Sequence, residues 1–371
     1  MSLNLRDTFL QLVRLGIGHT GTIYCTGLSD WVALKALAEA QGLSAVVLDG
    51  IDEVRSKRAD VRSDWFPSQY FLLEWIGEVL KDYEGRYAAY EKAISSLAGF
   101  YNSHGFKMMV LKGYACSLNW PKPNHRPCGD IDIWLFGQQR EADAALDAWF
   151  KSSKVQKFKI DKSHHHHTVF EWEGFTVENH YDFVNVHHHR SHRRLERIFK
   201  ELGKDDSHYV DVLGERVYLP SPNLHALFLL KHAALHFVGT ELTFRQILDW
   251  AFFVKRYGKD IDWEWLLSLI EEDGLTPFFH IVNAICIEDL GFELSLFPSC
   301  CYNPIDKEKV LNDIFVYEYH EETTSNILKR QINRFRRWKA NEWKHKLCYK
   351  ESMKSAFWSG VWNHLLKPRT I

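Results

Sequence analysis

Residues 110–136, VLKGYACSLNWPKPNHRPCGDIDIWLF, place two aspartates, Asp130 and Asp132, one residue apart in an apolar segment. Residues two apart on a β-strand point to the same side, so a strand here directs both carboxylates to one face while Ile131 and Ile133 pack on the other. Two unpaired carboxylates so close repel one another unless a cation neutralises them. The spacing predicts a site for a hard divalent cation such as Mg²⁺, which prefers oxygen ligands.

A third carboxylate is available in the later segment FTVENHYDF, residues 175–183, which also has the pattern of a strand. Glu178 and His180 fall on one face of that strand, and Glu178 is our candidate for the third acid. Three acidic groups on neighbouring strands hold two metal ions in phosphoryl and nucleotidyl transfer. The rival acids in the same region are Glu171, Glu173 and Asp182.

Candidate phosphate contacts precede the aspartates. Lys112 and Gly113 stand where an expected strand over 106–113 turns into a short helical segment, and glycine lets the backbone approach a phosphate closely. Lys112 adds a point charge, and Ser117 offers a hydroxyl. Arg126, four residues before Asp130, supplies a fork-shaped contact if its loop folds over a nucleotide.

This order of elements resembles the DNA polymerase beta-like nucleotidyltransferase superfamily. More closely, residues 100–255 are similar to a bacterial nucleotidyltransferase family with a Lys-Gly motif, a loop arginine and Asp-Ile-Asp. In that family a helical segment follows, with spaced histidines and an Arg-x-x-x-Asp pattern. Here it is LLKHAALHFVGTELTFRQILDW, residues 229–250, which carries His232, His236, Arg245 and Asp249 as possible cleft-lining residues.

The resemblance implies Mg²⁺-dependent transfer of a nucleoside monophosphate from an NTP, such as ATP, to an acceptor hydroxyl, with two metal ions. Carried over by position, Asp130 and Asp132 are the metal ligands, Glu178 is the third carboxylate and metal ligand, and Gly113 is the nucleotide-loop glycine. In the mechanism that we expect, Glu178 or His180 takes the acceptor proton. The nucleotide contacts are Lys112, Gly113, Ser117 and Arg126.

The chain departs from the superfamily pattern at two places. Tyr114 follows Gly113 where the superfamily usually has serine, and Asp130 comes 17 positions after Gly113, beyond a proline-rich loop. An alternative interpretation is therefore a catalytically inactive nucleotide- or protein-binding module on the same fold. A metal-dependent phosphohydrolase that uses the same acids is a third.

The fold class that the pattern predicts is α+β: a small mixed sheet over 101–220, between a helical N-terminal segment, 1–100, and a helical C-terminal domain, 221–371. The pattern predicts helices over 30–41, 68–105, 138–153 and 223–239, a strand over 155–160, and a hairpin that turns at Glu173-Gly174. With 371 residues and 46% hydrophobic residues, the chain has ample material for sizeable cores.

The net charge of −2 excludes a globally basic nucleic-acid binder. The seven cysteines form no regular framework, and no run of 18 apolar residues occurs. We therefore expect reduced thiols, a cytoplasmic protein and no membrane span. An NTP is the expected partner, with either a small molecule or a macromolecule as acceptor.

Three further features have a plain structural explanation beside a functional one. Histidines cluster at 164–167, 187–189 and 192, where we expect a solvated or acceptor-lining role rather than a transition-metal site, because consecutive histidines on a strand point to opposite faces. Arg245 and Asp249 are four apart, which suits an intrahelical ion pair. The segment 329–350 holds nine Lys or Arg and one acid and suits a solvated helix better than an RNA or membrane contact.

Overall fold

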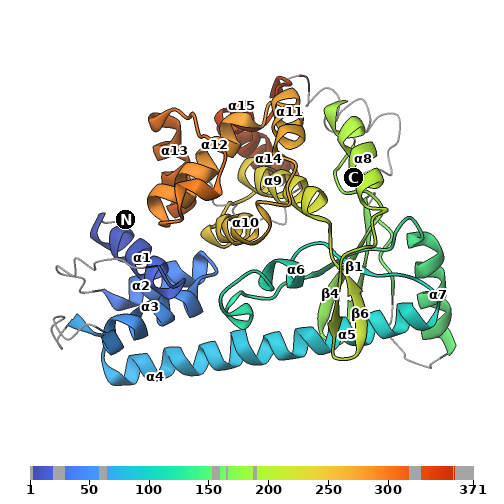
Figure 1. The fold of residues 1–371 in the computed structure, drawn as a ribbon, viewed down its shortest axis with the longest axis horizontal. Helices are drawn as coiled ribbons and strands as arrows, with labels where there is room; N and C mark the ends of the chain where they lie inside the picture. The colour runs from blue at the N-terminus through green and yellow to red at the C-terminus, as the bar shows by residue number, and fades with distance from the viewer. Residues whose placement is uncertain are drawn as a thin grey trace.

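A computed structural model shows helices at both ends of the chain and a mixed β-sheet between them (Figure 1), which confirms the α+β class. The structure describes residues 3–19, 30–57, 65–152, 159–163, 166–186, 190–316, 327–353 and 355. Among these, no helix has the length and apolar character needed to cross a membrane. Most of the strand expected over 155–160 lies outside the described residues.

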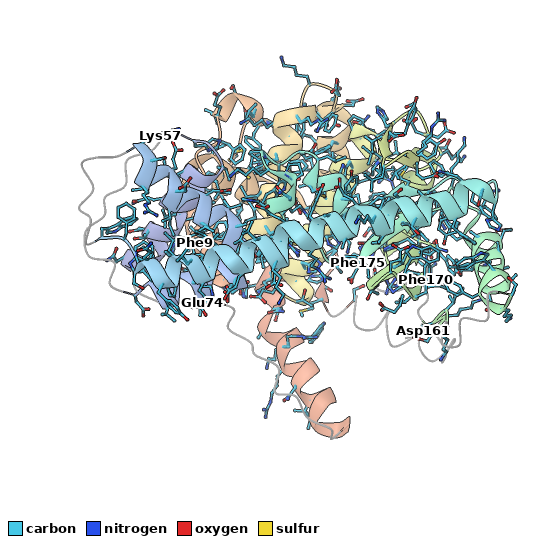
Figure 2. The ribbon with its side chains drawn as sticks, turned by 90° about the horizontal axis from the view of Figure 1, so that it is seen from below. Phe9, Lys57, Glu74, Asp161, Phe170 and Phe175 are labelled. Carbon is cyan, nitrogen blue, oxygen red and sulfur yellow. The ribbon has the colours of Figure 1, made fainter. Side chains whose placement is uncertain are left out.

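The N-terminal segment is helical, as predicted. Its helices are α1 (Leu3–Gly16), α2 (Trp31–Ala40), α3 (Ser44–Lys57), α4 (Gln69–Glu78), η2 (Val79–Gly85) and α5 (Arg86–Ser103). Asp30 and Ser68 cap α2 and α4, because the side-chain oxygen of each accepts a hydrogen bond from a first-turn N–H. The last three run on as one rod, from Glu74 near the N-terminal helices to the sheet near Phe175 (Figure 2).

The sheet has six strands in the order β3-β4-β2-β1-β6-β5. The strands are β1 (Met109–Val110), β2 (Ile131–Trp134), β3 (His167–Trp172), β4 (Phe175–His180), β5 (Tyr209–Val212) and β6 (Glu215–Tyr218). The β2–β4 and β1–β6 pairs are parallel and the others antiparallel. The β3–β4 hairpin turns at Glu173 and Gly174, both with positive φ, as the sequence predicts.

Helices α6 to α15 complete the described fold, and those predicted over 138–153 and 223–239 are both present. Their bounds are α6 (Tyr114–Ser117), η3 (Pro123–His125), α7 (Gln139–Ser152), α8 (Arg190–Leu202), α9 (Pro222–Gly239), α10 (Phe244–Tyr257), α11 (Trp263–Asp273), α12 (Thr276–Ala284), η4 (Ile285–Asp289), η5 (Leu294–Leu296), α13 (Pro304–Phe315), α14 (Ile327–Ala340) and α15 (Glu342–Cys348).

The two faces of the sheet belong to different hydrophobic clusters. Ile131, Ile133 and Val177 lie in a cluster with residues of α5 and α7. Trp134 lies in the larger cluster, which combines residues of the N-terminal helices with residues of α8 to α13. Alternation along β2 therefore sends its isoleucines to one cluster and Asp132 and Trp134 toward the other. The division into three domains stays a prediction.

Helices α1 and α3 approach each other closely because glycines stand at their contact. A Cβ added to Gly50 would lie 2.1 Å from the carbonyl oxygen of Leu12, and one added to Gly16 would lie 1.9 Å from that of Val46. Backbone atoms cannot move aside as a flexible side chain can. The contact therefore requires residues without a Cβ at both positions.

We expect Gly50→Ala to lower the free energy of unfolding by at least about 1–3 kcal/mol, because the added methyl forces the two helices apart. Gly77→Ala is the matched control. Gly77 is exposed in α4 and a Cβ there meets no atom within 4 Å, so alanine should stabilise the protein by about 0.5–1 kcal/mol. Urea unfolding measures both. If Gly50→Ala and Gly77→Ala changed the free energy of unfolding equally little, the close packing of α1 against α3 would be contradicted.

Candidate functional site

Asp132 is fully buried, in the middle of β2, and is held by two positive groups. Its Oδ1 accepts hydrogen bonds from Lys112 Nζ and from His180 Nε2, each at 3.0 Å. Lys112 follows β1 and His180 ends β4, so the pair of contacts ties together the three central strands. A buried carboxylate is tolerable only when paired and hydrogen-bonded, and here it is both.

The electrostatics of this cluster follow from the pairing. Burial raises the pKa of Asp132, but Lys112 and His180 outweigh it and hold the pKa well below its usual range. For His180, burial lowers the pKa, while Asp132 and Glu178 raise it to about 9. The hydrogen bond from His180 outweighs burial and lowers the pKa of Glu178. At neutral pH the cluster therefore holds two carboxylates, an ammonium and an imidazolium.

The structure brings Glu178 beside Asp132, as the sequence predicts. The two residues are register partners on the parallel strands β2 and β4, and Glu178 Oε2 lies 3.5 Å from His180 Nε2. A ligand atom from each of Asp132, Glu178 and His180 lies within 4.8 Å of the others. Asp132 Oδ2 and His180 Nδ1 are buried without a hydrogen-bond partner. Two neighbouring carboxylates with a spare oxygen are a set that fits a divalent cation, and His180 can add a nitrogen ligand once it has lost a proton.

Asp130 lies at the edge of this group rather than inside it. β2 begins at Ile131, so Asp130 precedes the strand and is exposed, whereas the sequence predicts both aspartates on one strand. The hydroxyl of Tyr90 donates to the Asp130 carbonyl at 2.8 Å. Partial burial, then Asp132 and Glu178, raise the pKa of Asp130, which shows that its carboxyl still senses the two other acids.

Gly113 makes the turn from β1 into α6 with φ +61°, and a Cβ there would lie 2.5 Å from the Tyr90 hydroxyl. Only glycine fits so close an approach with positive φ. Ser117, by contrast, is buried, and its hydroxyl donates to the Tyr114 carbonyl at 2.7 Å and contacts the Tyr87 hydroxyl at 3.0 Å. The structure thus places Gly113 beside the acids and directs Ser117 into the protein.

Arg126 and Asp249 form a buried two-pronged pair. Arg126 Nε and Nη2 donate to the two oxygens of Asp249 at 2.7 and 2.8 Å, and Trp120 Nε1 adds a third bond to Asp249 at 2.9 Å. Burial lowers the pKa of Arg126, but Asp249 outweighs burial and raises it. Arg126 therefore links its loop to α10 through Asp249, a residue 123 positions later in the sequence.

His232, His236 and Arg245 lie on α9 and α10 and are half-buried. The rings of His232 and His236 are 4.5 Å apart, one turn from each other. Burial, with a contribution from Lys112, holds the pKa of His232 well below its usual range and lowers that of His236 to about 4. Arg245 and Asp249 form no ion pair among the described residues, because Arg126 and Trp120 occupy Asp249.

The other singled-out segments lie as follows. The rings of His166 and His167 lie 6.4 and 5.5 Å from that of His180, while His164, His165 and His187–His189 lie outside the described residues. His192 Nδ1 bonds the Asn185 carbonyl at 2.7 Å. In the basic segment, Trp343 packs on Phe237 and Lys344 pairs with buried Asp313 at 2.6 Å, so this part of it belongs to the protein body.

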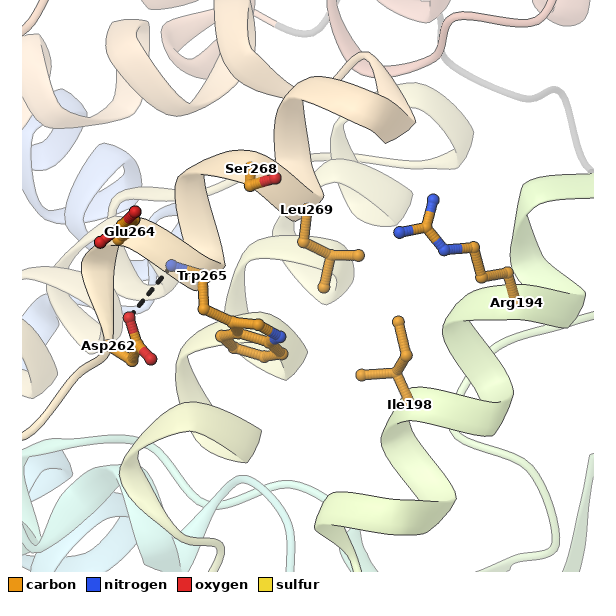
Figure 3. A pocket seen from close by; sticks show the side chains of 7 residues that line it. All are labelled: Arg194, Ile198, Asp262, Glu264, Trp265, Ser268 and Leu269. Atoms are coloured by element: carbon orange, nitrogen blue, oxygen red, sulfur yellow. Dashed lines mark hydrogen bonds between the residues drawn. The ribbon is translucent and has the colours of Figure 1, made fainter.

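A cavity of about 400 Å³ lies apart from these residues, between α8 and α11 (Figure 3). Its lining combines apolar side chains with polar and charged ones. The lining residues are Arg194, Ile198, Asp262, Glu264, Trp265, Ser268 and Leu269. No predicted site residue is among them.

The sequence pattern misses a buried bridge beside the Arg126 loop. His125 Nδ1 contacts Asp49 Oδ2 at 2.6 Å, and His125 Nε2 contacts Glu84 Oε1 at 3.1 Å. Burial lowers the pKa of His125, but the two carboxylates outweigh it and the pKa is raised. The partners are 76 and 41 residues away, so no local pattern reveals them. The bridge holds the loop that carries Arg126 to α3 and η2.

This bridge predicts a pH dependence of stability. Because the folded-state pKa of His125 is raised, its contribution is fully present below its unfolded pKa of about 6.5 and is lost as pH rises through the folded value. We therefore expect the stability gap between the wild type and His125→Gln to be larger at pH 6 than at pH 9, in urea unfolding. A gap that is independent of pH would contradict a charged bridge.

Comparison with known proteins agrees with this geometry. The model of a family described as an uncharacterised nucleotidyltransferase matches residues 28–290, which is more than half of the chain and includes every predicted site residue. Searches of curated proteins and of solved structures find no match.

Proposed function

The chain belongs to the uncharacterised nucleotidyltransferase family, and from this membership and the site we propose that it is a Mg²⁺-dependent enzyme that transfers a nucleoside monophosphate from an NTP to an acceptor hydroxyl. One observation carries the proposal: Asp132 and Glu178 stand side by side on parallel strands, with His180 between their oxygens. Two carboxylates this close repel one another, and a shared cation offsets that repulsion.

The proposed metal ligands are Asp132 and Glu178, with Asp130 completing the set from the edge. Mg²⁺ held by these carboxylates would supply the positive charge that activates an attacking oxygen and offsets the charge of a leaving pyrophosphate. In the absence of a metal ion, Lys112 and His180 supply the positive charge that the Asp132 carboxylate requires. These two residues keep the carboxylate ionised and in place, ready to bind a cation.

The remaining residues position substrates and protons. Gly113 keeps the backbone close beside the acids, and Lys112, which is partly exposed, is the proposed contact for the α-phosphate. Glu178 and His180 are the two groups beside Asp132 that we propose as acceptors for the proton of the acceptor hydroxyl. Attack is in line, and positioning with charge neutralisation provides most of the rate gain.

The test is pyrophosphate release from a mixture of NTPs with Mg²⁺ and a panel of hydroxyl acceptors. We expect Glu178→Gln and Asp132→Asn each to reduce release by at least about a hundredfold, because each removes a carboxylate from the cation. Glu173→Gln is the matched control, since Glu173 lies in the turn of the same hairpin and contacts Ser96. Unchanged release in Glu178→Gln would refute the proposal.

Mn²⁺ binding, followed by electron paramagnetic resonance, separates metal binding from chemistry. The wild type and Glu173→Gln should bind Mn²⁺ alike, and Glu178→Gln should bind it more weakly.

The Ser117 hydroxyl is directed into the protein and Tyr114 stands in place of the usual serine, which favours a second candidate, an inactive nucleotide-binding module. That module would bind Mn²⁺ and NTP without releasing pyrophosphate with any acceptor.

A further inference from the structure

Tyr90 joins two parts of the proposed site at one point. It lies in α5 and is fully buried, and its ring packs edge-on against Phe175, with the ring centroids 5.1 Å apart. Its hydroxyl donates to the Asp130 carbonyl at 2.8 Å. A Cβ on Gly113 would lie 2.5 Å from that hydroxyl and 3.5 Å from the Asp130 carbonyl oxygen. The turn after β1, the segment before β2 and the Tyr90 hydroxyl therefore meet, although they are far apart in the sequence.

Asp130 depends on this contact because no strand holds it. Asp132 and Glu178 lie inside β2 and β4, where the pairing of the two strands fixes the backbone. Asp130 precedes β2, and the residue before it, Gly129, is exposed, with no atom within 4 Å of a Cβ added there. Among the described residues, the Tyr90 hydroxyl is the one hydrogen-bond partner that Asp130 has. The conformational freedom of the glycine is therefore limited at Asp130 by this bond.

A second residue of α5 holds the same segment. Arg86, one turn before Tyr90, donates from Nε to the Cys128 carbonyl at 3.3 Å, and its guanidinium carbon lies 4.8 Å from the centre of the Phe175 ring. Figure 2 shows α5 as it runs past Phe175. The carbonyls of Cys128 and Asp130 thus both accept hydrogen bonds from one long helix, which supports the backbone that leads into β2.

We propose that Tyr90 is a positioning residue for the metal site, which holds Asp130 where its carboxylate joins Asp132 and Glu178 around a divalent cation. The inference rests on the proposed function and adds to it the residue that places the acid at the edge of the group. A peptide unit is planar, so a bond to the Asp130 carbonyl orients the whole unit between Asp130 and Ile131. The side chain of Asp130 leaves the chain next to that unit. Tyr90 contacts no reacting atom and acts through Asp130.

Mn²⁺ binding, followed by electron paramagnetic resonance, tests this role with Tyr90→Phe, which removes the hydroxyl and keeps the buried ring. The variant should bind Mn²⁺ about threefold to tenfold more weakly than the wild type, the range for the loss of one hydrogen bond. Tyr101→Phe is the matched control. Tyr101 is fully buried in the same helix, but its hydroxyl has no hydrogen-bond partner within the described part of the chain. Tyr101→Phe should bind Mn²⁺ as the wild type does, and equal affinities of the two variants would overturn the inference.

A double-mutant cycle with Asp130→Asn separates positioning from a general loss of structure. Asparagine keeps the backbone carbonyl that Tyr90 binds and removes the carboxylate. Once Asp130→Asn is present, Tyr90→Phe should weaken Mn²⁺ binding by less than about twofold, because the group that it positions is gone. If Tyr90→Phe weakened Mn²⁺ binding equally with and without Asp130→Asn, the hydroxyl would not act through Asp130 and the inference would be overturned.

The two proposals fail separately. If Tyr90→Phe weakens Mn²⁺ binding as expected but the wild type releases no pyrophosphate with any acceptor, the positioning role is supported and the transferase is refuted. If the wild type releases pyrophosphate and Tyr90→Phe binds Mn²⁺ as the wild type does, the transferase is supported and the positioning role is refuted. A wild type that binds no Mn²⁺ refutes both.

Discussion

The buried carboxylate of Asp132 is the constraint on which the rest of the site depends. An ionised carboxylate removed from water is costly, and one positive group seldom offsets that cost in full. Here two groups from two neighbouring strands, Lys112 and His180, share one of its oxygens. The pairing fixes the relative positions of β1, β2 and β4, and it leaves the second oxygen of Asp132 without a partner. A purely structural ion pair has no reason to leave that atom buried and unsatisfied.

Charge is distributed unevenly around this carboxylate. The sheet contributes the acids, Asp130, Asp132 and Glu178, whereas α9 and α10 contribute histidines that burial keeps neutral and an arginine without a counter-ion. The Arg126–Asp249 pair fastens the loop before β2 to α10 and so sets the separation of the two halves. Under the proposed function, the substrate is a metal-bound nucleoside triphosphate, which carries both a divalent cation for the acids and phosphates for the basic residues.

The local sequence pattern was enough to predict which residues share one face of a strand. It was not enough to predict contacts between residues far apart in the sequence. Alternation along β4 correctly placed Glu178 and His180 on one face, and the parallel pairing with β2 then brought Glu178 to Asp132. The same alternation placed Asp130 on β2, but the strand begins at Ile131, and the Asp130 carbonyl accepts a hydrogen bond from the Tyr90 hydroxyl of α5. For Asp249 the local rule offered Arg245, four residues away. The distant Arg126 binds instead, because its fork meets both carboxylate oxygens.

Lys112 belongs to both halves of the site, and this dual role links them. Its ammonium offsets the charge of Asp132 in the absence of a metal ion, and part of its side chain is exposed, so it is also the proposed contact for a phosphate. A phosphate that draws Lys112 away leaves Asp132 with less compensation and so strengthens its attraction for a cation. By linkage, a cation that replaces Lys112 at Asp132 frees the ammonium for a phosphate to the same extent. Under the proposed function, metal and nucleotide therefore bind with positive cooperativity, and neither half of the site holds its ligand as well alone as both halves do together.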